Sequence, residues 1–124
     1  MGKGWRALNQ TQGTLLCARL EAADGIAEQS RGLLGRERLE PECGMLFENS
    51  PLLPFMWMHM FFMRFPIDIV FLDKSRRVIR INRELKPWRV SSVVFGARTA
   101  LELESGAAAR SGTETGDKII LQEL

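Results

Sequence analysis

The stretch from Leu52 to Leu72 constrains the fold of this 124-residue chain more than any other segment. It reads LLPFMWMHMFFMRFPIDIVFL and holds four of the six methionines, five of the seven phenylalanines and the only histidine. Pro54 and Pro66, with several polar residues, interrupt the run of about 20 apolar residues that a membrane-spanning helix needs. We therefore expect no membrane span, and we place this stretch inside a water-soluble fold.

The alternation within this stretch is typical of extended backbone. From Phe55 to Phe62 large apolar groups occupy both alternating sets, which predicts a strand covered on both of its faces. Pro66 breaks the pattern and Ile67 to Leu72 resumes it. A turn around Ser75 then leads to a return strand from Val78 to Leu85, so we expect a hairpin of about 20 residues.

Shorter patterns complete a β-rich α+β domain. We expect further strands at Thr14–Leu20, Gly44–Phe47, Ala100–Glu104 and Lys118–Leu121, and short helices at 25–34 and 106–110. In the strand at 100–104, Leu101 and Leu103 are predicted to face inward, with Glu102 and Glu104 facing outward. The prediction is a single compact domain over residues 13–124, with six or seven mostly antiparallel strands in a partly closed barrel. Residues 1–12 are predicted to be an N-terminal extension.

Charge and cysteine content exclude little. The net charge of +2 gives no general attraction for nucleic acid, although seven basic residues gather between Lys74 and Arg89. That basic segment is either a solvated face, partly paired with the acidic tail, or an anion-binding footprint. Cys17 and Cys43 lie far apart in the sequence and fit buried small hydrophobic residues better than a zinc site, although a disulfide stays open. The start of the chain shows no secretory signal, which predicts a cytoplasmic protein.

Six short motifs occur in a recognisable order. They are SRGLLGR at 30–36, GMLF at 44–47, HMFFMRFPIDIVFLD at 59–73, LKPWR at 85–89, LELESG at 101–106 and GD at 116–117. In this order the chain resembles the bacterial and archaeal family catalogued as domain of unknown function 192, over residues 13–121. It is similar to the branch that reads M-R-F-P-I-D, so the polar residues of the W-M-x-N-T branch do not transfer. The resemblance implies a compact β-rich fold and no agreed activity, and some members of the family are exported.

His59 and Asp68 are the two candidates for chemistry. His59 is either a packed core histidine or an acid, base or ligand, because its ordinary pKa lies near neutrality. Thioethers at Met56, Met58 and Met60 suggest a copper(I) site. Residues two apart on a strand, however, lie about 6.8 Å apart, which opposes it. Asp68 must reach solvent or pair with a cation, and Arg31, Arg36 or Arg64 could supply an ion pair that fixes the bend at Pro66.

The Pro87-Trp88-Arg89 loop is the remaining candidate for binding. Such a tryptophan either covers the end of a barrel or stacks on a ligand beside the arginine. We expect a non-catalytic binding or accessory domain whose rim carries arginines for an anionic small molecule or a peptide. The rim and site comprise Arg31, Arg36, His59, Arg64, Asp68, Trp88 and Arg89. The alternative is an enzyme that acts on a small anionic substrate with Asp68, His59 and the arginines. Neither a cofactor nor a metal is expected, and nucleic acid is not favoured as a partner.

Overall fold

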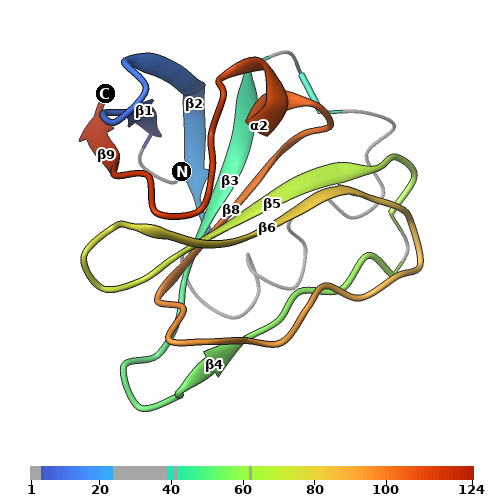
Figure 1. Ribbon diagram of the computed structural model, residues 1–124. Helices are drawn as coiled ribbons and strands as arrows, with labels where there is room; N and C mark the ends of the chain where they lie inside the picture. Colours follow the sequence, from blue (N-terminus) through green and yellow to red (C-terminus); the bar gives the residue numbers. More distant parts are fainter. Residues whose placement is uncertain (1–3, 24–38, 41, 62) are drawn as a thin grey trace.

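A computed structural model describes residues 4–23, 39–40, 42–61 and 63–124 of the chain. Nine strands and one short helix lie within these residues. In chain order they are β1 (Gly4–Asn9), β2 (Thr14–Ala22), β3 (Cys43–Glu48), β4 (Phe55–Met56), β5 (Ile67–Leu72), β6 (Val78–Leu85), β7 (Val94–Phe95), β8 (Thr99–Glu104), α2 (Ala107–Arg110) and β9 (Ile119–Glu123). The predicted β-rich single domain is confirmed (Figure 1).

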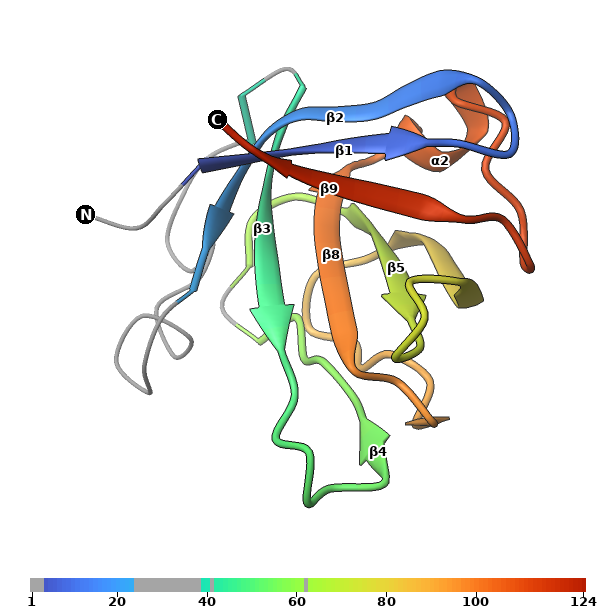
Figure 2. The ribbon, with the colours of Figure 1, turned by 90° about the vertical axis from the view of Figure 1, so that its left-hand side faces the viewer.

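Seven strands form one curled sheet in the order β6-β5-β8-β3-β2-β1-β9. All neighbours are antiparallel except β2 and β3, which run parallel. The two edges of this sheet meet at one end, where Arg77 bridges Lys118. Backbone hydrogen bonds of 2.9 Å from Val78 to Asp117 and from Ile119 to Arg76 fasten that junction. The sheet is therefore a barrel that closes only partly, as predicted, and its curl is visible in Figure 2.

Alternating side chains of this sheet build two separate hydrophobic cores. In β5, Val70 and Leu72 belong to the inner core of the curl, which also receives Val78 and Ile119 from the two edge strands. Ile67, Ile69 and Phe71 of the same strand point to the opposite face and enter a second, outer core. Because the side chains of a strand alternate between faces, one strand buried on both sides supplies both cores.

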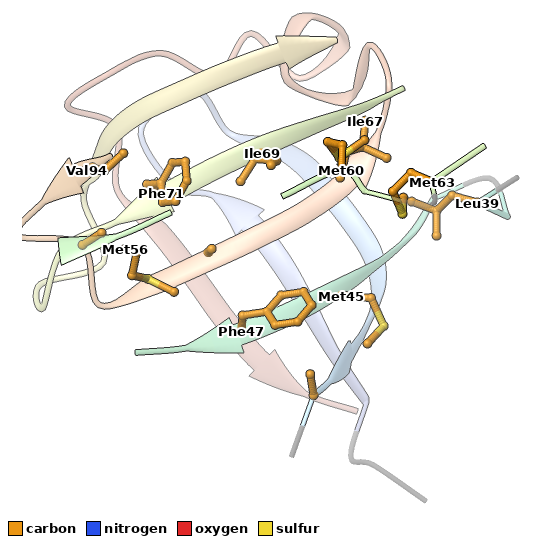
Figure 3. Close-up of a cluster of buried hydrophobic side chains, with 13 residues drawn as sticks. Leu39, Met45, Phe47, Met56, Met60, Met63, Ile67, Ile69, Phe71 and Val94 are labelled. Atoms are coloured by element: carbon orange, nitrogen blue, oxygen red, sulfur yellow. The ribbon is translucent and has the colours of Figure 1, made fainter. Parts of the chain in front are cut away.

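The outer core is covered by two segments that run together beneath the sheet (Figure 1). We call residues 55–61 and 88–95 the outer ribbon. Its strands β4 and β7 pair through Phe55 with Phe95 and Met56 with Val94, and His59 bridges Val90 further along. Figure 3 shows Met56 and Met60 of this ribbon in one cluster with Phe71 and Ile67 of the sheet, Met56 on the side of Phe71 and Met60 on the side of Ile67.

The structure corrects the predicted strand from Phe55 to Phe62. Regular pairing stops after Met56, because the Met58 amide donates instead to the Ser91 hydroxyl at 2.8 Å. Side chains still alternate, with Met56 and Met60 buried and Trp57 and Phe61 exposed. The segment is thus covered on one face only, and the expectation that both faces are buried was wrong.

The remaining elements agree with the sequence patterns where they can be compared. The helix predicted at 106–110 is α2, whereas the helix predicted at 25–34 lies outside the described residues. Residues 4–9, which we assigned to an N-terminal extension, form β1 between β2 and β9. Within the described ranges, none of the helical structure has the length and apolar character that crossing a membrane requires.

Candidate functional site

The outward side of the outer ribbon exposes an unusual number of large apolar side chains. We define the aromatic face as the exposed apolar and aromatic residues of the ribbon together with His59: Trp57, His59, Phe61, Trp88, Val90, Val93 and Phe95. Trp88 is 59% exposed and Phe95 is 73% exposed. Single exposed apolar residues are common, but contiguous apolar patches rimmed by polar groups mark interaction sites.

Three rings on the aromatic face contact one another in series. The His59 ring stacks on Phe61 with centroids 5.1 Å apart and an interplanar angle of 25°. Phe61 in turn contacts Trp88 at a centroid distance of 6.3 Å. The Phe61 amide donates to His59 Nδ1 at 3.3 Å, so a neutral His59 carries its proton on Nε2. His59 is thus an exposed, oriented hydrogen-bond donor beside two aromatic rings, and the prediction of a packed core histidine was wrong.

Trp88 occupies a backbone conformation that bulky residues rarely adopt. The turn Lys86–Arg89 closes through a backbone hydrogen bond of 3.3 Å, and Trp88 sits at its third position with φ 67°. Glycine or asparagine normally occupies such a position, because a side chain makes the left-handed region costly. The Trp88 amide also donates to the Met60 carbonyl at 2.7 Å, which fixes the turn against the ribbon. The indole is therefore held out in solvent, which contradicts the expectation that it covers a barrel end.

A cavity of about 260 Å³ opens beside the aromatic face. His59 and Trp57 line it on the ribbon side, and Phe47 and Leu53 provide apolar walls. Its volume suits a single medium or large apolar side chain better than a whole drug-sized ligand. The arrangement can therefore accept one anchoring group next to an exposed stacking surface.

Positive charge borders this surface. Lys86 and Arg89 flank Trp88 in its turn, and both are exposed. In the described part of the chain their side chains make no hydrogen bond or ion pair. Arg64 is exposed as well and has contacts of its own. Unpaired cations next to apolar rings favour a partner that presents a negative charge close to an apolar group.

Asp68 lies on the other side of the sheet from this surface. The residue is 1% exposed, and its carboxylate accepts hydrogen bonds from the Glu84 amide at 2.9 Å and the Ala108 amide at 3.0 Å. Two backbone N–H groups satisfy the carboxylate, and no arginine of residues 4–23, 39–40, 42–61 and 63–124 forms the predicted ion pair with Asp68. The sheet separates Asp68 from His59, so the two cannot act on one small substrate.

Of the predicted site residues, the structure brings His59, Trp88 and Arg89 together. The His59–Val90 bridge and the hydrogen bond of 2.7 Å from the Met60 amide to the Arg89 carbonyl join the two segments that carry them. Arg31 and Arg36 lie outside the described residues. Trp57, Phe61 and Phe95 are members of the surface that the sequence patterns did not single out. The clustering of aromatic residues between 55 and 62 was the available signal for the first two.

Glu102 is a buried carboxylic acid, although the alternating pattern of its strand predicted that it faces solvent. It is 5% exposed, and its neighbours across the ladders are Met45 and Ile69. Burial raises the pKa of Glu102 from its ordinary value of 4.5 to about 8. No hydrogen bond to its carboxyl group occurs within residues 4–23, 39–40, 42–61 and 63–124. The side chain therefore prefers the neutral acid at moderate pH, and the outward prediction was wrong.

The described residues contain no group of three His, Cys, Asp or Glu side chains that could hold a metal ion. Cys17 is buried and Cys43 is partly buried, and both are free thiols. Burial raises the pKa of Cys17 to about 11, and its Sγ donates to the Glu42 carbonyl at 3.2 Å. A thiol with so high a pKa is a poor nucleophile near neutrality. Cys17 is thus a packing residue.

The fold and surface define a small β-rich domain, a partly closed barrel that carries one exposed aromatic face. The chain belongs to the domain of unknown function 192 family, described as Uncharacterized ACR, whose family model matches residues 7–121. A UPF0127 protein of Thermococcus sibiricus is 31% identical over 112 residues, which cover 90% of this chain and 71% of that protein. A UPF0127 protein of Pyrococcus abyssi is 27% identical over 117 residues, covering 90% and 93%.

Two solved structures share the fold. A protein of unknown function from Novosphingobium aromaticivorans superimposes with a TM-score of 0.75 at 28% identity, covering 94% of this chain and 83% of that one. A Sinorhizobium meliloti protein gives a TM-score of 0.81 at 22% identity, covering 97% and 93%. The second likeness concerns the fold alone. These relatives confirm the family that the motif order indicated.

Proposed function

We propose that this protein is a non-catalytic binding domain whose aromatic face takes a short peptide segment. The segment would carry an aromatic or large aliphatic side chain next to an acidic residue. The observation that supports this most is the ring series His59, Phe61 and Trp88, which is exposed on the outer ribbon. Tryptophan and arginine are the residue types that most often dominate binding energy in protein interfaces.

The cavity and the cations suit two different groups of such a peptide. An apolar side chain would enter the cavity lined by Trp57 and His59, where burial would stabilise the complex. An acidic side chain would lie beside Arg89 and Lys86, which flank Trp88. The guanidinium of Arg89 would form the stronger pair, because its planar fork matches a carboxylate.

The conformation of Trp88 gives independent support. A bulky residue at φ 67° carries a cost in stability that a glycine in the same turn would avoid. Strained residues persist where the surrounding structure holds them, and they cluster at ligand-binding sites. A tryptophan retained in solvent at such a position is expected when the indole itself contacts a partner.

The experiment is selection from a random peptide library displayed on phage, with the wild-type protein, Trp88→Gly and a control as baits. Arg6→Gln is the matched control, because Arg6 is exposed on β1, away from the aromatic face. We expect wild-type and control baits to enrich peptides in which an aromatic or leucine side chain neighbours Asp or Glu. Trp88→Gly should enrich none of them. Equal enrichment by Trp88→Gly, or no common pattern with the wild-type bait, would overturn the proposal.

A further inference from the structure

Arg98 lines a second cavity, separate from the one beside His59. This cavity has a volume of about 390 Å³, and its walls include Leu53, Pro54, Lys74 and Ser75. Arg98 is partly buried, and its Nε atom is shielded from solvent and has no hydrogen-bond partner among the residues that the structure describes. A buried donor of this kind is costly when nothing accepts from it, so the position calls for an acceptor.

Hydrogen bonds on both sides of the Arg98 Cα atom fix the backbone of this residue. The Arg98 amide donates to the Leu72 carbonyl at 2.8 Å, and the Arg98 carbonyl accepts from the Asn49 amide at 2.8 Å. The Asn49 side chain also holds the carbonyl of Ala97 at 3.2 Å. These bonds tie Arg98 to the end of β5 and to the loop after β3. Because this backbone is already anchored, ligand binding at Arg98 requires ordering of the side chain but not of the backbone.

The neighbouring arginine shows the contrast. Arg76 Nη1 lies 3.2 Å from the Glu48 carboxylate and donates to the Thr99 hydroxyl at 2.7 Å. In the described part of the chain, neither Arg98 nor Lys74 has a comparable side-chain partner. Two cations at one cavity are thus available, while the arginine next to them is already neutralised.

Asp73 is the one carboxylate among the residues that line this cavity. Its Oδ1 atom accepts from the Ser75 amide at 2.8 Å and from the Arg77 amide at 3.0 Å, which shapes the turn between β5 and β6. It forms no ion pair with Lys74 or Arg98 among the described residues. The cavity therefore keeps a net positive charge, with a hydroxyl from Ser75 and an apolar wall from Leu53 and Pro54.

We propose that this cavity binds a small organic oxyanion, a carboxylate or phosphate attached to a compact apolar body. The charged group would accept hydrogen bonds from the Arg98 guanidinium and would pair with the Lys74 ammonium. The apolar body would rest on Leu53 and Pro54. The planar fork of arginine suits carboxylate and phosphate equally, so the headgroup is a question for the experiment.

The test is titration of the ¹⁵N-labelled 124-residue protein with benzoate, phenyl phosphate and inorganic phosphate, followed by two-dimensional NMR. The readout is the Arg98 Nε–H signal together with the backbone amides of residues 73–75 and 96–98. We expect saturable shifts confined to these groups with at least one organic probe, and weaker binding of inorganic phosphate, which lacks the apolar body. The probe that binds more tightly identifies the headgroup.

Variants separate a built site from general attraction. Arg98→Gln and Lys74→Gln should each weaken binding about ten- to a hundredfold, the range for a lost hydrogen bond to a charged group. Arg80→Gln, which removes an exposed cation from β6, should leave the affinity unchanged. Lys74 is exposed, so its substitution reports even if Arg98→Gln impairs folding. The proposal would be overturned if none of these signals shifted at millimolar probe concentrations in 20-fold molar excess over the protein. It would also be overturned if all three variants lowered the affinity equally. Neither result bears on the aromatic face, because Arg98 and Lys74 do not belong to it.

Discussion

The Asp68 carboxylate accepts a hydrogen bond of 3.0 Å from the backbone amide of Ala108 and thereby ties the beginning of β5 to α2. The helix has four residues, and its N-cap residue, Gly106, has no side chain that could cap the first turn. A carboxylate that accepts from an amide in that first turn satisfies one of the donors that a helix leaves unpaired. Asp68 therefore acts as a remote cap for α2, and its second oxygen holds β6 through Glu84.

We predict that Asp68→Ala lowers the free energy of unfolding by about 2–4 kcal/mol, because the buried Ala108 amide loses its acceptor. Asp68→Asn should cost less, since one carbonyl oxygen remains. Urea unfolding followed by circular dichroism measures both. Glu114→Gln, an exposed acid in a loop, is the control and should change stability by less than about 0.5 kcal/mol. A loss of that small size for Asp68→Ala would contradict the capping role.

Because the carboxyl group of Glu102 is buried, we predict an unusual dependence of the free energy of unfolding on pH. The unfolded chain ionises near the ordinary value of 4.5, whereas the folded protein keeps the proton until about pH 8, because burial raises the pKa of Glu102. Between these values the folded state binds more protons, so the contribution of Glu102 to stability falls as pH rises, by up to about 1.4 kcal/mol per pH unit. Above pH 8 the penalty stays constant.

The measurement is the difference in unfolding free energy between wild type and Glu102→Gln from pH 4 to pH 9. Glutamine does not ionise, so the variant should gain on the wild type steadily between pH 5 and pH 8. Each protein is measured in the same buffers, which removes the contribution of all other groups. A difference that does not change across this range would show that the carboxyl group is not held neutral by its surroundings.

The backbone strain at Trp88 can be tested through the stability of two variants. Trp88→Gly relieves the strain of φ 67°, which offsets the lost contact with Phe61, so stability should stay within about 1 kcal/mol of wild type or rise. Trp88→Ala loses the same ring but keeps a Cβ in the left-handed region. We therefore expect the alanine variant to be less stable than the glycine variant by about 1 kcal/mol in urea unfolding. Equal stability of the two variants would refute strain at this position.

The atoms around Gly44, at the centre of the sheet, leave no room for a side chain at this position. A Cβ atom at Gly44 would lie 2.5 Å from the Glu102 backbone carbonyl and about 3.0 Å from the Leu20 side chain. Backbone in a central strand cannot move away readily, so Gly44→Ala should lose about 1–3 kcal/mol of stability. Gly4→Ala is the matched control, because its Cβ would meet only the flexible Leu124 side chain at 3.3 Å. Thermal unfolding of both variants tests this, and similar melting temperatures would contradict it.

Much of the sheet could be predicted because period-2 patterns carry their information locally. Ile67–Leu72, Val78–Leu85 and the strand around Leu101 all form where the alternation and the turn residues placed them. The pairing of β2 with β3, which is parallel, has no local signal. Strand order depends on contacts between distant residues, and these are not written in any short pattern.

The candidate site was predictable in part. The aromatic cluster around His59 and the Pro87-Trp88-Arg89 loop stood out in the sequence, and the structure brings them together. Their exposure could not be foreseen, because an apolar strand reads the same whether a neighbour covers it or not. Glu102 was misplaced for the related reason that β8 lies between β5 and β3, with a second core over its outer face. Arg98 has no sequence signal at all, since its significance comes only from the lack of a partner for Nε within the described part of the chain.

The two hydrophobic cores on opposite faces of the curled sheet have a consequence for how this protein can change. The sheet separates the two cores, so the side chains on one face pack mainly against different residues from those on the other face. Substitutions in separate neighbourhoods tend to combine additively. Evolution, or a designer, can thus revise the layer beneath the aromatic face, including its methionines, while the inner compartment goes on maintaining the barrel unaltered.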